Sequence, residues 1–129
     1  MTITIIRGVS GSGKTTYAKK IEALHLENDM FCMQDGVYEF DFDEIKRRAG
    51  HCLRLAKLAA KTECDIVISN TFTQVWEMQP YLDLAKKHNA NLKVIALKTK
   101  YKNTHGVPDF AIERMYARWE DFKGEKIIK

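Results

Sequence analysis

The stretch Gly8-Val9-Ser10-Gly11-Ser12-Gly13-Lys14-Thr15 decides the fold of this chain. It matches in full the pattern G-x-x-x-x-G-K-[ST], a glycine-rich loop whose backbone N–H groups surround phosphates. The preceding residues 2–7 are apolar and rich in β-branched side chains, which predicts a buried strand, and we expect a helix over about 14–21. A strand, a glycine-rich loop and a helix in this order are the setting that the motif requires.

The residue types in this loop predict a nucleoside triphosphate site. Lys14 is expected to reach the β- and γ-phosphate oxygens, where it is also a candidate catalytic residue, and the hydroxyl of Thr15 is expected to bind Mg²⁺. We therefore predict ATP or GTP binding, with ATP and Mg²⁺ as the preferred pair. The predicted cofactor-binding residues are Gly8, Ser10, Gly11, Ser12, Gly13, Lys14, Thr15 and Thr16.

Strands and helices alternate along the rest of the chain. The apolar periodicity predicts strands at 24–27, 65–70 and 92–98, and helices at 43–61, 75–88 and from 109 onward. This alternation predicts an α/β fold with three layers, in which helices cover both faces of a mostly parallel sheet and the ligand lies at the carboxyl ends of the strands. We expect one domain over 1–129, in which the tail 123–129 either pairs as an edge strand or frays.

Composition excludes several classes of protein. The chain has 129 residues, and no apolar stretch approaches the roughly 20 residues of a membrane span. The N-terminus does not resemble a signal peptide, so we expect a cytoplasmic location. Three cysteines without a C-x-x-C pair argue against a disulfide framework or a zinc site and are expected to be buried thiols: Cys32, Cys52 and Cys64.

The charges are unevenly distributed. Residues 22–44 contain eight carboxylates and no Lys or Arg, so the remainder carries all 21 Lys and Arg against nine carboxylates. Such an excess suits an anionic substrate such as a nucleotide or nucleic acid, although a solvated surface also explains much of it. A GTPase would need an Asn-Lys-x-Asp motif, which residues 97–100 lack, and the 65–70 strand does not end in the acid of an ATPase magnesium site. A small kinase therefore fits better.

Four blocks of sequence resemble the polynucleotide-kinase-like P-loop kinases, most closely short phage-encoded members such as 5-hydroxymethyluracil DNA kinases. They cover nearly the whole chain: the loop at 8–15; Asp29-Met30-Phe31 with Gly36-Val37-Tyr38-Glu39-Phe40; Ile68-Ser69-Asn70-Thr71-Phe72-Thr73 with Trp76-Glu77-Met78-Gln79-Pro80-Tyr81; and Asn103-Thr104-His105-Gly106-Val107-Pro108 before Ile112, Met115, Arg118 and Glu120. The resemblance implies ATP-dependent phosphorylation of a hydroxyl, often on a nucleic acid.

The resemblance also implies roles for individual residues. Asp29 falls where the family has its general base, and Asp35 is the competing candidate. Residues 99–108 correspond to the family's lid, in which Lys102 precedes Asn103 at a point where the family usually has Arg. Lys supplies charge to the transferring phosphate without the two-pronged geometry of Arg. Further candidate cations are Lys98, Lys100, Arg114 and Arg118.

Other residues carry two readings each. Asn70 and Thr71 either hold a water or substrate oxygen or simply cap the strand, and Trp76 either stacks a nucleobase or packs in the core. His51 is interpreted as a packing or substrate-contact residue. The last helix is expected to bury an inward face of Ile112, Met115, Tyr116 and Trp119.

Three functions follow. The first is a nucleic-acid hydroxyl kinase whose favoured acceptor is the hydroxymethyl group of 5-hydroxymethyluracil in phage DNA, a step in thymidine hypermodification, with a strand's 5′-hydroxyl as the alternative. The second is a small-molecule or nucleoside kinase. The third is a nucleotide-dependent switch without phosphate transfer. DNA is thus the expected partner, and no association with a membrane is expected. If the chain is phage-encoded, it is expected to act in the host cytoplasm.

Overall fold

A computed structural model describes residues 1–27, 33–34, 37–38, 42–98 and 107–129. Its elements follow the predicted alternation of strand and helix. They are β1 (Thr2–Arg7), α1 (Lys14–Ala18), β2 (Leu24–Leu26), β3 (Met33–Gln34), β4 (Val37–Tyr38), α2 (Phe42–Lys61), β5 (Ile66–Asn70), α3 (Val75–Lys87), β6 (Asn91–Leu97), α4 (Asp109–Ala117) and β7 (Lys126–Ile128).

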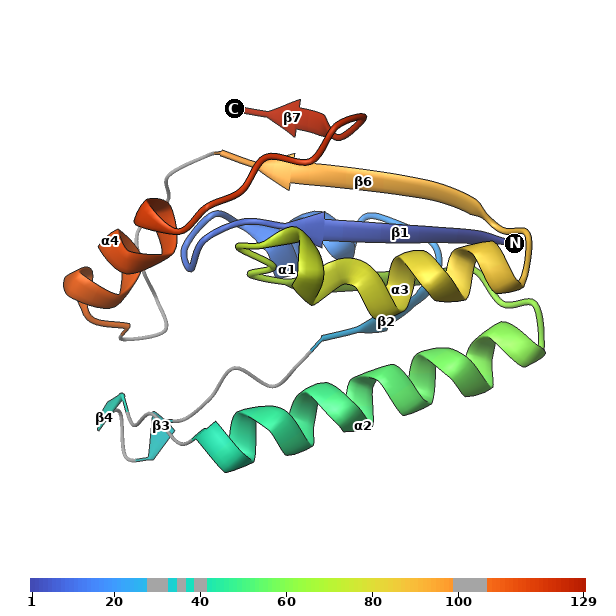
Figure 1. Cartoon of the computed structure of the whole chain (residues 1–129), viewed down its shortest axis with the longest axis horizontal. Coiled ribbons are helices and arrows are strands. Elements are labelled where there is room, and N and C mark those ends of the chain that lie inside the picture. The colour runs from blue at the N-terminus through green and yellow to red at the C-terminus, as the bar shows by residue number, and fades with distance from the viewer. Residues whose placement is uncertain (28–32, 35–36, 39–41, 99–106) are drawn as a thin grey trace.

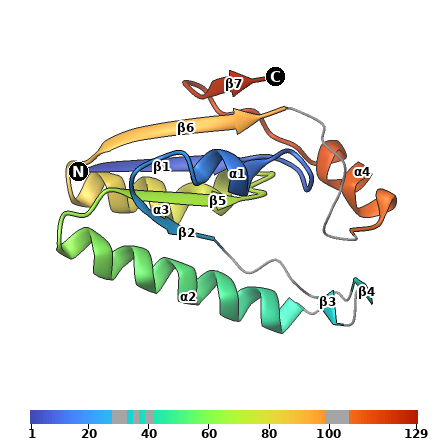
Figure 2. The same cartoon turned by 180° about the vertical axis from the view of Figure 1, so that it is seen from behind.

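Five of these strands form one sheet in which all the strands are parallel, in the order β2-β5-β1-β6-β7 (Figure 1). The central strand β1 places Ile5 between Ile68 of β5 and Val94 of β6. The tail pairs as an edge strand, because Ile127 of β7 lies opposite Ala96 of β6. The short strands β3 and β4 form a separate antiparallel pair beyond the amino end of α2 (Figure 2).

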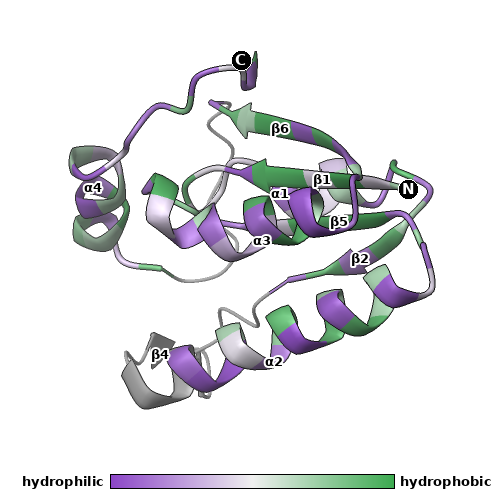
Figure 3. Ribbon diagram, turned by 45° about the vertical axis from the view of Figure 1, so that its right-hand side comes forward, coloured by the Kyte–Doolittle hydropathy of each residue, from purple (hydrophilic) through white to green (hydrophobic). Residues whose placement is uncertain are grey.

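The two faces of the sheet bury different helices, which confirms the three-layer prediction. Alternate side chains of a strand point to opposite faces. Ile3 and Ile5 pack in the core cluster that contains residues of α2 and α3, whereas Ile6 packs with Ala18 of α1. All three isoleucines are fully buried, and each contributes roughly 1.5–3 kcal/mol by leaving water. Figure 3 shows hydrophobic colours along much of β1, β5 and β6.

The long helix α2 is amphipathic. Cys52, Ala56 and Ala60 recur at helical spacing and are buried, while Arg54 and Lys57 between them are exposed. Small alanines let the helix approach the sheet closely. The outward face leaves its basic side chains in solvent.

Two sequence-based expectations are wrong. Cys64 is exposed, although Cys52 is buried as predicted. Helix α4 buries none of its residues, and Tyr116 is 41% exposed. Trp119 lies beyond the helix and is half-buried between two cations, with the Arg7 guanidinium carbon 4.1 Å and the Lys98 ammonium nitrogen 4.0 Å from its ring centre. Apolar residues at helical spacing therefore do not form a buried face of α4.

None of the helices in the described part of the chain is long and apolar enough to cross a membrane.

Candidate active site

The phosphate loop connects β1 to α1 at the carboxyl edge of the sheet. The Gly8 N–H donates to the Thr71 carbonyl at 3.2 Å, which fastens the start of the loop to the segment after β5. A Cβ on Gly8 would collide with the Ser12 hydroxyl and lie 2.9 Å from the Leu97 carbonyl oxygen, so this position has room only for glycine. Gly11 and Gly13 have φ values of 85° and 86°, which glycine adopts without strain.

Lys14 is held inside the loop. Its Nζ donates to the Val9 carbonyl at 3.0 Å, and only 5% of the residue is exposed. Burial lowers the pKa of Lys14 to about 8, against the opposing effect of the Glu27 carboxylate. The ammonium is therefore largely charged at pH 7, and phosphate oxygens are the natural replacement for the single carbonyl that it now contacts.

The Ser12 hydroxyl is a second feature of the loop that fits the predicted nucleotide. The Ser12 hydroxyl is buried and has no hydrogen-bond partner among the described residues. A buried hydroxyl without a partner is costly, and a phosphate oxygen that reached it would offset that cost. The loop thus combines a buried cation, an unsatisfied hydroxyl and two glycines with positive φ.

Glu27, which directly follows β2, is a candidate site residue that the sequence reasoning missed. Its Oε2 accepts hydrogen bonds from Thr15 Oγ1 at 3.1 Å and from Ser69 Oγ at 3.0 Å. His25 Nε2 lies 2.7 Å from Ser69 Oγ and 3.3 Å from Glu27 Oε2. In the sequence Glu27 is one of eight carboxylates spread over residues 22–44. Only its position at the end of a predicted strand distinguishes Glu27 from the other acids. That position indicates a place beside the loop only when the order of strands in the sheet is known.

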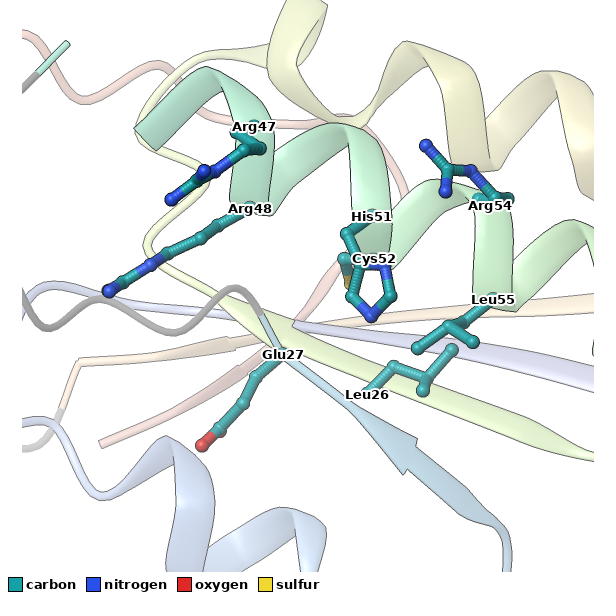
Figure 4. A pocket seen from close by; sticks show the side chains of 8 residues that line it. All are labelled: Leu26, Glu27, Arg47, Arg48, His51, Cys52, Arg54 and Leu55. Atoms are coloured by element: carbon teal, nitrogen blue, oxygen red, sulfur yellow. The ribbon is translucent and has the colours of Figure 1, made fainter. Parts of the chain in front are cut away.

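A basic pocket of about 490 Å³ lies between the end of β2 and helix α2 (Figure 4). Three arginines give it a cationic wall, to which His51 adds an imidazole ring, and Figure 4 shows the Glu27 side chain turned from the pocket toward α1. Glu27 both lines the pocket and contacts Thr15, so this one residue stands between the pocket and the phosphate loop. The lining residues are Leu26, Glu27, Arg47, Arg48, His51, Cys52, Arg54 and Leu55. His51, one of the sequence candidates, is exposed there and thus available to a ligand.

Two of the remaining candidates lie at the end of β5. Asn70 is buried opposite Arg7 of β1, and Thr71 is half-buried with its carbonyl bound to Gly8. Both therefore border the loop, as predicted.

Trp76 lies on α3 and Arg114 on α4 instead, and Arg118 directly follows α4. Trp76 is 70% exposed, so the core-packing alternative is wrong, and its Nε1 donates to Gln74 Oε1 at 2.8 Å. Arg118 donates to Thr73 Oγ1 at 3.0 Å, whereas Arg114 stacks over the ring of Phe110. Arg118 is thus occupied in joining α4 to the segment before α3.

Several sequence candidates lie outside the described residues and stay predictions. They are Asp29 and Asp35 as general base, and Lys100, Lys102 and His105 of the proposed lid. Among the described residues, no cluster of three or more His, Cys, Asp or Glu is placed to hold a metal ion. A cation at Thr15 would therefore take several of its ligands from water and from the nucleotide phosphates, as Mg²⁺ does in such sites.

The AAA domain family AAA_33 matches residues 3–104. This chain belongs to that family. The AAA_33 chain is 29% identical to human NEDD4-binding protein 2 over 99% of its own length, and it spans 8% of that protein. It is also 29% identical to the uncharacterised protein PM0531 of Pasteurella multocida, with 89% of this chain and 74% of that protein aligned.

Solved structures show the same architecture. A sugar kinase from Janibacter superposes with a TM-score of 0.66 at 15% identity, covering 99% of this chain and 83% of that one. A chain of the Pnkp1/Rnl/Hen1 RNA repair complex superposes with a TM-score of 0.64 at 17% identity, covering 91% of this chain and 43% of that one. The AAA_33 chain therefore has a P-loop kinase-like fold.

Proposed function

We propose that this chain transfers the γ-phosphate of ATP to a hydroxyl on a nucleic acid. The observation that carries the proposal is the basic pocket, because its arginines and His51 lie beside the phosphate loop that would hold the donor. A basic pocket close to the loop that would hold the donor favours an acceptor that is itself anionic. A nucleotide unit carries both the hydroxyl and the phosphate that such a pocket would bind.

The residues divide the chemistry between them. Lys14 and the loop N–H groups hold the phosphates, and Mg²⁺ bound at Thr15 would neutralise charge that develops during transfer. The acceptor oxygen attacks the γ-phosphorus in line, the bond from that phosphorus to the β,γ-bridging oxygen breaks, and ADP leaves. The hydroxyl proton passes to Asp29, and Lys102 supplies positive charge to the transferring group; both roles rest on the family resemblance.

The favoured acceptor is the hydroxymethyl group of 5-hydroxymethyluracil in DNA. A pocket of about 490 Å³ is large enough for one nucleotide unit, so a base within a duplex would have to leave the stack to enter it. The alternative on the same polymer is a strand's 5′-hydroxyl.

The size of the pocket also favours a second candidate function. Small-molecule sites enclose roughly 300–1,000 Å³, and the basic pocket lies within that range. A nucleoside or another small phosphorylated molecule would occupy the same position beside the loop.

The test is transfer of labelled γ-phosphate to four acceptors. They are an oligonucleotide with a free 5′-hydroxyl, one with blocked ends and internal 5-hydroxymethyluracil, an unmodified blocked oligonucleotide, and the free hydroxymethyl nucleoside. Label on the blocked modified strand alone supports the favoured acceptor, and label on the free end alone supports the 5′-hydroxyl. If no oligonucleotide is labelled and the nucleoside is, the nucleic-acid proposal is wrong.

Two variants accompany this experiment. Asp29→Ala is expected to lower kcat by about 100- to 10,000-fold, the usual contribution of a general base. Asp83→Ala is the matched control, because Asp83 is exposed on α3 and only pairs with Gln79 of the same helix. Equal activity of the two variants would remove Asp29 from the mechanism.

A further inference from the structure

The strand that usually supplies an acid to the magnesium site lacks one in this chain. In phosphate-loop proteins the ion is held by the loop Ser or Thr and by an aspartate from a neighbouring strand. Here β5, the strand that pairs with β1 beside the loop, ends in Ser69 and Asn70. A magnesium site at Thr15 therefore needs a carboxylate from elsewhere.

We propose that Glu27, from the end of β2, is the carboxylate of the Mg²⁺ site. The inference rests on the proposed nucleotide site but not on the identity of the acceptor. The parallel pairing of β2 with β5 sets Leu26 opposite Ile68, so the next residues along each strand, Glu27 and Ser69, emerge side by side at the carboxyl edge. The carboxylate thus lies one strand farther from β1 than the usual acid and still reaches the loop.

The spacing of the oxygens fits this role. Two oxygens bound next to each other on Mg²⁺, each about 2.0–2.1 Å from the ion, lie about 3 Å apart. Thr15 Oγ1 and Glu27 Oε2 are 3.1 Å apart. Glu27 keeps about a third of its side chain exposed, so a hydrated ion has access to it.

Ser69 and His25 act as positioning residues for this carboxylate. Ser69 Oγ has one hydrogen, which it donates to Glu27 at 3.0 Å. His25 Nε2, 2.7 Å from Ser69 Oγ, is then the donor to that hydroxyl. The chain of donors from His25 through Ser69 holds the Glu27 oxygen on the side of the loop, in the manner of the outer hydrogen bonds that orient metal ligands.

Electrostatics separates this role from a purely structural one. The Glu27 carboxylate lies 3.1 Å from Thr15 Oγ1 beside the loop, so its negative charge would repel the phosphates of a nucleotide bound there. A divalent cation between the carboxylate and the phosphates converts that repulsion into attraction. Glu27 should therefore weaken nucleotide binding without Mg²⁺ and strengthen it with Mg²⁺, whereas a structural residue would strengthen both.

The experiment measures binding of a non-hydrolysable ATP analogue by calorimetry, with excess Mg²⁺ and with EDTA. For the unaltered chain we expect Mg²⁺ to tighten binding by at least about tenfold; this ratio of the affinities with Mg²⁺ and with EDTA is called the Mg²⁺ ratio. For Glu27→Gln we expect most of the Mg²⁺ ratio to vanish, because loss of a group that tunes a metal site costs about 10- to 100-fold. In EDTA, Glu27→Gln should bind as tightly as the unaltered chain or tighter. Glu22→Gln, the same change at an exposed position of the same segment, is the control and should keep the full ratio.

A rescue variant tests the location of the charge. Adding Ser69→Asp to Glu27→Gln returns a carboxylate to the end of β5 and should restore at least part of the Mg²⁺ effect. The inference is overturned if Glu27→Gln keeps the full ratio, if it loses affinity equally with and without Mg²⁺, or if the unaltered chain binds no nucleotide.

Failure of the proposed function gives a different pattern. A chain that binds Mg²⁺ and nucleotide through Glu27 but labels no acceptor keeps this inference and loses the kinase. If the unaltered chain labels an acceptor but Glu27→Gln keeps the full Mg²⁺ ratio, the kinase proposal stands and the inference about Glu27 is wrong.

Discussion

Arg7 and Glu125 form a buried ion pair of 2.9 Å between the central strand and the C-terminal segment, with side chains 0% and 3% exposed. The same guanidinium donates to the carbonyls of Phe72, Thr73 and Glu120, and its face lies against Trp119. Arg7 directly precedes the phosphate loop. One side chain therefore joins the start of the loop, the segment after β5 and the tail of the chain.

Removing the charge of Glu125 should destabilise the protein strongly. Breaking a buried ion pair at one partner costs about 3–5 kcal/mol, because the remaining charge stays in a medium of low dielectric. The carbonyl partners of Arg7 offset part of this, so we expect Glu125→Gln to lower the free energy of unfolding by about 3 kcal/mol in urea denaturation. Glu113→Gln, on the exposed side of α4, should change it by less than about 0.5 kcal/mol. Equal stability of the two variants would mean that the pair contributes little.

Replacing Lys14 should stabilise the free protein while abolishing its nucleotide site. Burial lowers the pKa of Lys14 to about 8, which means that the fold holds this charge at a cost. The expected gain for Lys14→Met is about 1–2 kcal/mol at pH 7, because the lost hydrogen bond to Val9 cancels part of the benefit. Unfolding in urea measures the gain, and calorimetry measures the loss of nucleotide binding. If Lys14→Met is less stable than the unaltered chain, burial of the Lys14 charge does not cost stability and this interpretation is wrong.

Nucleotide affinity and the stability of the free protein should both depend on pH through Lys14. Above pH 8 the free protein loses the Lys14 proton, whereas bound phosphates favour the charged form, so nucleotide affinity should fall as the pH rises from 8 to 9.5. The stability of the free protein should move the other way. The unfolded lysine keeps its proton up to about 10.5, so the unfolded state binds more protons between pH 8 and 10.5 and the free energy of unfolding rises over that window.

Calorimetry and urea denaturation at several pH values measure the two trends. The variant Lys14→Met should lack the contribution of this residue to the stability trend. The interpretation is wrong if the variant keeps the whole trend.

The basic pocket should determine the affinity for the acceptor rather than for ATP. Arg48→Ala or Arg54→Ala is expected to raise the KM for a phosphate-bearing acceptor by about tenfold, roughly the value of one charge-assisted contact, with a small effect on kcat. Lys57→Ala removes a charge from the exposed face of α2 outside the pocket lining and serves as the control. If all three variants raise KM equally, general surface charge and not the pocket attracts the acceptor.

The prediction from sequence was accurate where local pattern carries the information. The apolar residues 2–7 and the glycines after them predict a strand and a phosphate-binding loop without reference to the rest of the chain, and both are present. The boundaries of α2 and α3 agree with the expected ranges to within one residue, because helical periodicity reports which face is buried. Helix α1 ends at Ala18 and not near Ile21, since the chain turns there toward β2.

The placement of side chains from different elements could not be predicted in the same way. Trp119 has the spacing of a core residue, yet its surroundings are two cations from β1 and from the end of β6. Trp76 was assigned to the core more readily than to the surface and is exposed. The roles of Asp29 and Lys102 remain predictions, because the structure does not describe these residues.

By itself the sequence determined the phosphate loop, the alternation of strands and helices and the class of fold, because each depends on residues that are neighbours in the chain. Only the tertiary structure decided that β2 pairs with β5, and with that pairing it brought Glu27 to Ser69 and Thr15. The order of strands in a sheet depends on which faces and edges pack best across the whole molecule. One of the eight acids in residues 22–44 becomes a candidate metal ligand only when that order places it beside the loop.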